Sequence, residues 1–119
     1  MSKTTGPETR VLMLPGRDGR RVIVCEGEFD MGSQAALRQA LETAHDDGIT
    51  RTVVDLAGVS FADSSMLNTL IQAHRRQHLV LAGPLTPQVS RLLEISGAYA
   101  LFTIAADTAS TTEPTAQLP

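Results

Sequence analysis

The sequence is poor in residues on which several large classes of protein depend. It has no Trp, only 3% aromatic residues and a single cysteine, Cys25, among 119 residues. One cysteine excludes an internal disulfide framework and fits a reducing compartment. Few aromatic side chains and a net charge of −3 argue against nucleic-acid binding, which depends on basic patches and stacking rings.

The sequence also has no long apolar run, and it therefore predicts no membrane span. Its first ten residues are polar and contain Pro7, so no signal peptide is predicted. We therefore expect a cytoplasmic protein without a membrane partner. Apolar residues make up 42% of the chain, which suffices for the core of one domain. Cys25 lies in an apolar run, where a small buried side chain is expected.

Hydrophobic periodicity and turn residues predict alternating strands and helices. Strands at residues 10–14 and 21–26 flank a turn-rich segment and should form an antiparallel hairpin. The pattern predicts further strands at 52–56, 79–82 and 101–104, and helices at 33–46, 65–76 and 87–96. These elements indicate an α/β fold, a single small domain with a mixed, mostly parallel sheet on which the helices pack. Residues 57–62 are expected to turn the chain.

The stretch from Val53 to Leu70 organises this fold, because it reads as a buried strand, a loop and the start of a helix. Asp63, Ser64 and Ser65 stand at the helix start, and residues of these types cap the first turn of a helix. In open α/β sheets, this position after a strand is also where binding sites lie. A serine there stands where free N–H groups favour an anion such as phosphate. Capping and modification are compatible roles, and both stay open.

Residues that could support catalysis or bind a metal are present, but their spacing does not fit. A nucleophile elbow needs Gly-x-Ser-x-Gly, whereas the segment Ala62-Asp63-Ser64-Ser65-Met66 has neither glycine. No glycine-rich phosphate loop followed by Lys-Ser or Lys-Thr occurs. His74 and His78 are four residues apart, but no third ligand is close in sequence. We predict no enzymatic activity, cofactor or metal, and a small enzyme or nucleotide-binding domain is the least favoured alternative.

Four segments resemble the STAS domain of bacterial anti-sigma factor antagonists. Gly27-Glu28-Phe29-Asp30 is similar to the family's Gly-Glu-Leu-Asp, and residues 54–65 resemble its strand-to-helix signature. Residues 79–84 and 89–97 are similar to its next strand and its third helix. The resemblance covers about residues 11–105 in the family's order.

The resemblance implies one STAS domain at residues 10–105. On either side the sequence is polar and poor in apolar residues. Residues 1–9 are therefore predicted to be a flexible arm, and residues 106–119 a disordered tail.

The resemblance also implies a partner-switching mechanism. In the family, the first serine after the signature Asp is phosphorylated by an anti-sigma factor with serine kinase activity. Here that residue is Ser64, with Ser65 as the second choice. The unphosphorylated protein binds the anti-sigma factor and releases the sigma factor, which regulates transcription, for example in a stress response. The phosphorylated form dissociates until a serine phosphatase restores it, because the added charge and bulk disrupt a docked interface.

By the same resemblance, the partner-binding residues are expected to be Asp30, Phe61, Asp63, Ser64, Ser65 and Met66. Met66 stands where the family usually has glycine, which permits close approach of the partner. The alternative is a STAS module without a working switch, a structural subunit of a transport or signalling complex. An exposed Ser64 hydroxyl would favour the switch, and one buried against Met66 would favour the structural module. We expect a monomer.

Overall fold

The computed structural model describes residues 9–16 and 18–108. Residues 1–8 of the expected arm and 109–119 of the expected tail lie outside this part. The elements are β1 (Arg10–Met13), β2 (Arg20–Phe29), α1 (Ala35–Asp46), β3 (Arg51–Ala62), α2 (Ser64–His74), β4 (His78–Ala82), α3 (Pro87–Ser96), the 3-10 helix η1 (Ala98–Ala100) and β5 (Thr103–Ala105). No helix in this part of the chain is long and apolar enough to cross a membrane.

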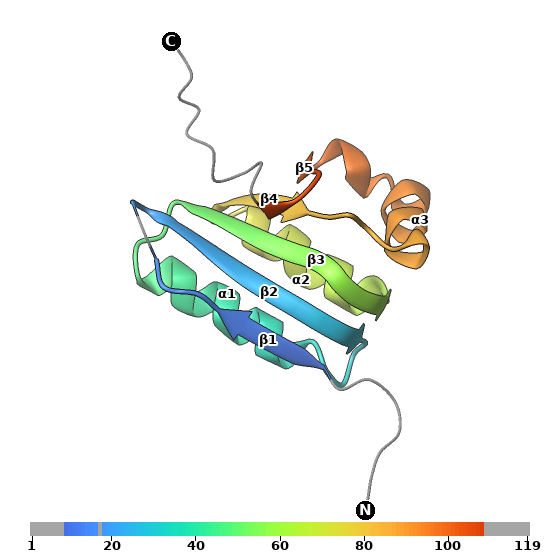
Figure 1. The fold of residues 1–119 in the computed structure, drawn as a ribbon, viewed down its shortest axis with the longest axis horizontal. Coiled ribbons are helices and arrows are strands. Elements are labelled where there is room, and N and C mark those ends of the chain that lie inside the picture. The colour runs from blue at the N-terminus through green and yellow to red at the C-terminus, as the bar shows by residue number, and fades with distance from the viewer. Residues whose placement is uncertain (1–8, 17, 109–119) are drawn as a thin grey trace, which may run out of the picture.

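The strands form one sheet in the order β1-β2-β3-β4-β5. β1 is antiparallel to β2, and each later neighbour is parallel to the one before it. Helices α1 and α2 lie side by side along one face, and α3 lies near the end of β3 (Figure 1). The predicted α/β fold, with a mostly parallel sheet and an N-terminal hairpin, is therefore confirmed.

The core lies between the sheet and the helices and is almost entirely aliphatic. β2 contributes Ile23, Cys25 and Phe29, each fully buried, and α1 contributes Leu37 and Leu41. Burial raises the pKa of the Cys25 thiol to about 12, and the nearby Asp55 charge adds to the effect. Cys25 is thus the small buried side chain that its sequence context predicts.

The prediction that residues 57–62 turn the chain is wrong, because β3 continues to Ala62. Val24 pairs with Asp55 but Glu26 pairs with Gly58, and a second register shift follows Gly27. At each shift β3 holds one more residue than β2, which is the pattern of a β-bulge. The extra residues break the two-residue alternation, so the buried positions after Leu56 are spaced three apart, at Val59 and Ala62.

The helix ends follow the sequence signals to within a few residues. α3 begins with Pro87 and ends before Gly97, whose φ of +81° suits glycine. Thr86 occupies the N-cap, but its hydroxyl makes no capping bond and donates to the Val59 carbonyl at 3.0 Å. That hydrogen bond ties the start of α3 to the bulged part of β3.

Candidate functional site

The candidate site lies where β3 ends and α2 begins, the position that the sequence predicts. The Asp63 backbone N–H donates to the carbonyl of Phe29, the last residue of β2, at 3.1 Å. The ends of β2 and β3 therefore stay joined, and the turn that begins at Asp30 lies next to the first residues of α2. Two segments about thirty residues apart in sequence thus form one surface.

Asp63 is the N-cap of α2. Its carboxylate accepts the Ser65 N–H at 2.9 Å and the Met66 N–H at 3.3 Å, and it also accepts the Ser65 hydroxyl at 2.6 Å. The Ser65 hydroxyl is the main cause that lowers the pKa of Asp63, partial desolvation opposes it, and the N–H groups of Met66, Ser65 and Met31 lower it further. Asp63 is therefore an ionised acceptor whose main task is to start the helix.

The two candidate serines differ in what their hydroxyls do. Ser64 is the first residue of α2 and is exposed. Within residues 9–16 and 18–108, its hydroxyl has no hydrogen-bond partner. Ser65 is half-buried, and its hydroxyl donates to Asp63. Of the two, Ser64 alone presents a free hydroxyl to a docking protein.

Asp30 is exposed, but its carboxylate is hydrogen-bonded within the turn that it begins. Its carboxylate accepts the N–H groups of Gly32 and Ser33, each at 3.0 Å, and lies 2.9 Å from the Ser33 hydroxyl. This is the side-chain-to-backbone pattern by which Asp fixes a tight turn. Asp30 therefore shapes the loop, and the residue that the loop holds out to solvent is Met31.

Two large apolar side chains stand exposed at this surface. Met31 is 77% exposed, and Phe61, one of the expected partner-binding residues, is 40% exposed. The Met31 N–H lowers the pKa of Asp63, so Met31 lies next to the helix start. Sequence reasoning missed Met31, although an apolar residue between the turn residues Asp30 and Gly32 is a detectable signal.

Met66, which was expected among the partner-binding residues, does not lie on this surface. Its side chain is 1% exposed and belongs to the main core cluster. In this structure it cannot touch a partner without a rearrangement of the core. The surface around Ser64 thus consists of Asp30, Met31, Phe61, Asp63, Ser64 and Ser65; we call this set the Ser64 surface.

A glutamine that sequence reasoning did not single out fixes the end of β3. The Gln88 side chain accepts the Ala62 N–H and donates to the Ala62 carbonyl, each at 2.8 Å. Gln88 lies in the first turn of α3. Through its two hydrogen bonds, α3 therefore fixes Ala62, the residue directly before Asp63. No local pattern indicates such a contact, because it joins residues 26 positions apart.

His74 and His78 have structural contacts. His74 accepts the Leu79 N–H through Nδ1 at 3.3 Å, and its ring packs on Phe102 and His78 with centroids 5.1 and 6.0 Å away. In the part of the chain that the structure describes, no three His, Cys, Asp or Glu side chains are grouped as metal ligands.

Comparison with known proteins gives one family and several similar folds. The family model described as "Mlab, STAS domain" matches residues 13–103. An anti-sigma factor antagonist from Mycobacterium paratuberculosis has a TM-score of 0.78 and 23% identity, over 87% of this chain and 90% of that one. A comparison with curated proteins gives no match.

The antagonist SpoIIAA has the same fold in two forms. Its unphosphorylated form has a TM-score of 0.73 and 19% identity, over 86% of this chain and 93% of that one. Its phosphorylated form, from Bacillus, has a TM-score of 0.66 and 19% identity, over 87% and 97% of the two chains. At such identities these likenesses concern the fold.

Proposed function

The chain belongs to the STAS domain family, and from this premise we propose that it is an anti-sigma factor antagonist. Domains of this family are binding proteins and not enzymes. In the proposal, the Ser64 surface binds an anti-sigma factor that has serine kinase activity. Phosphorylation of Ser64 ends the binding, and a serine phosphatase restores it. The protein acts as a monomer in the cytoplasm and controls the release of a sigma factor.

The exposed and unbonded hydroxyl of Ser64 carries this proposal. A kinase needs a hydroxyl that it can reach without first breaking the fold, and Ser64 offers one at the first residue of a helix. Ser65 would have to give up its 2.6 Å hydrogen bond to Asp63. The accessible Ser64 also fits the expectation that an exposed hydroxyl favours the switch over a silent structural module.

The charge and polarity of the Ser64 surface explain how a phosphate would act. Phosphorylation adds about −1.5 to −2 charges at neutral pH. It would add them directly beside Asp63 and close to Met31, an exposed apolar side chain whose N–H hydrogen-bonds to the Asp63 carboxylate. A partner that covers this apolar side chain would have to desolvate the phosphate, which is costly without a new cationic contact.

A binding measurement with four forms of the protein tests the proposal. We expect Ser64→Asp to lose binding to the serine-kinase anti-sigma factor of the same organism, while Ser64→Ala binds and resists phosphorylation. Asn68→Asp is the matched control, because Asn68 is also exposed on α2 and the change adds one charge about one turn further along. Wild-type affinity in Ser64→Asp, or equal losses in both Asp variants, would contradict a switch at Ser64.

A second candidate is the STAS module without a switch, a structural subunit of a transport or signalling complex. The description "Mlab, STAS domain" of the matching family model supports it, because that wording names no anti-sigma role. The buried Met66, at the position where the family usually has glycine, also fits this candidate. The two proposals differ in whether Ser64 is ever phosphorylated.

A further inference from the structure

A hollow between α1 and α2 extends from Thr69, which hydrogen-bonds to the Ser65 carbonyl, to the turn after α2. Its lining residues come from both helices and the turn after α2, and they are Arg38, Leu41, Glu42, His45, Thr69, Ala73, Arg76 and Gln77. The hollow has a cavity volume of about 50 Å³ and is open to solvent on one side. Ala73, a small side chain in the α1–α2 contact, leaves room where a larger residue would fill the gap.

The inner wall of this hollow is held in place. Gln77 is 8% exposed, and its amide donates to the Leu41 carbonyl at 3.0 Å. Its other end accepts the hydroxyl of Thr52, a fully buried residue of β3. Gln77 therefore connects the end of α2, the middle of α1 and the sheet. A ligand would meet a wall that needs no ordering when it binds, which lowers the cost of binding.

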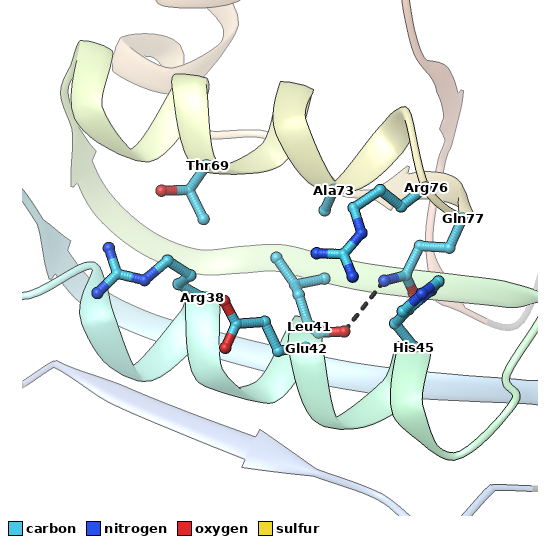
Figure 2. A pocket seen from close by; sticks show the side chains of 8 residues that line it. All are labelled: Arg38, Leu41, Glu42, His45, Thr69, Ala73, Arg76 and Gln77. Atoms are coloured by element: carbon cyan, nitrogen blue, oxygen red, sulfur yellow. Dashed lines mark hydrogen bonds between the residues drawn. The ribbon is translucent and has the colours of Figure 1, made fainter.

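The rim of the hollow is cationic, although the protein as a whole carries a net charge of −3. Two arginines, Arg38 and Arg76, lie there with the imidazole of His45 and one carboxylate, Glu42. In the described part of the chain the ion pairs are Arg10–Glu26 and Arg21–Asp47, so neither rim arginine is paired with a carboxylate. Figure 2 shows the Arg76 side chain reaching from the end of α2 toward α1, with His45 and Gln77 on one side and Glu42 on the other.

We propose that this hollow binds a small phosphate compound between Arg76 and His45. The planar guanidinium group of Arg76 can donate two parallel hydrogen bonds to phosphate oxygens, and the imidazole of His45 can donate a third from the opposite helix. Leu41 and Ala73 offer an apolar floor for a small organic group attached to the phosphate. This inference rests on the α1–α2 hollow alone and does not depend on the role of Ser64.

A simpler reading is that these basic side chains only complement the carboxyl ends of the helices, where they are favourable. His45 lies in the last turn of α1, and Arg76 directly follows α2. In that case no saturable anion site exists. The two readings therefore differ in whether anion binding to the hollow saturates.

The test is an NMR titration of the ¹⁵N-labelled protein with inorganic phosphate and with glycerol 3-phosphate, with chloride at equal ionic strength as the salt control. We expect saturable shifts confined to amides near residues 41–45 and 73–77. Arg76→Gln should weaken binding by about tenfold or more, the amount expected for a charge-assisted bidentate contact. Glu42→Gln should tighten it, because the variant removes the one carboxylate of the rim.

Arg75→Gln is the matched control, because Arg75 is exposed, carries the same charge and does not line the hollow. It should leave the affinity within about twofold of wild type, because Arg75 does not line the hollow and makes no bidentate contact there. Shifts that do not saturate, shifts that chloride reproduces, or equal losses in Arg75→Gln and Arg76→Gln would overturn the proposal. All three substitutions are at exposed positions, and thermal unfolding of each variant verifies its fold.

Discussion

The Asp63 carboxylate accepts the hydroxyl hydrogen of Ser65 at 2.6 Å. The same carboxylate caps α2 through the N–H groups of Ser65 and Met66. The Asp63 side chain thus starts the helix and also accepts a hydrogen bond from the hydroxyl of Ser65, the second of two adjacent serines. Ser64, the first of them, is left with an exposed hydroxyl, so the capping arrangement itself distinguishes the two candidate phosphorylation sites.

This arrangement predicts unequal effects of alanine at the two serines. Ser65→Ala should lower the free energy of unfolding by about 0.5–1.5 kcal/mol, because it removes one intramolecular hydrogen bond. Ser64→Ala should change it by less than about 0.5 kcal/mol, as expected for an exposed side chain without a partner. Urea unfolding of both variants measures the difference. A larger loss in Ser64→Ala would show that Ser64, and not Asp63, is the effective cap.

Asp63 should make stability depend on pH in the acid range. In the folded protein, hydrogen bonds lower the pKa of Asp63 below its ordinary value of 3.8. The unfolded chain therefore takes up the proton first as the pH falls. The stabilisation is therefore complete well above pH 3.8 and is lost as the pH falls through the lowered value. We expect the stability advantage of wild type over Asp63→Asn to shrink from neutral pH toward acid, as urea unfolding at a series of pH values would show. An advantage that grows toward acid would contradict this account.

Replacing Met66 with glycine should damage the fold before it affects docking. Met66 is buried in the main core, and loss of a large core side chain costs about 2–5 kcal/mol. Glycine within a helix adds about 1 kcal/mol relative to alanine. Thermal unfolding measures the sum, and Met66→Leu is the control because it nearly conserves volume. Unchanged stability in Met66→Gly would show that the side chain does not lie in the core.

Gln88→Ala should release the end of β3. Gln88 makes two hydrogen bonds of 2.8 Å to the backbone of Ala62, and leaving these partly buried groups unpaired costs about 1–3 kcal/mol. Amide hydrogen exchange should accelerate at Ala62 in particular. Gln72→Ala is the matched control, because Gln72 is exposed on α2. Equal exchange rates at Ala62 in both variants would remove Gln88 from this role.

The order and type of the elements could be predicted from the sequence because local signals mark them. Turn residues separate β1 from β2, and Pro87 and Gly97 bound α3 where the structure has it. β5 begins at Thr103, two residues later than predicted, because Leu101 still has helical dihedral angles and donates its N–H to the Ala98 carbonyl at the end of η1. These shifts are small because local propensity decides where such elements form.

The long β3 could not be predicted, since its two bulges erase the alternation by which a strand is recognised. The sequence pointed to the segment from Phe61 to Ser65 by its capping residues, and to Asp30 by the family resemblance. Met31 and Gln88 belong to it through contacts with residues far along the chain. Only the pairing of β2 with β3 and the packing of α3 bring them there.

Phosphorylation-site mapping tests the central proposal most directly. The protein would be incubated with ATP and the serine-kinase anti-sigma factor of the same organism, then digested and analysed by mass spectrometry. The proposal predicts one phosphate, located on Ser64, on wild type and on Ser65→Ala, and none on Ser64→Ala. A phosphate on Ser65 would contradict a switch at Ser64. A wild-type protein that stays unmodified, while the same kinase preparation phosphorylates another antagonist protein, would contradict the switch and favour the structural module.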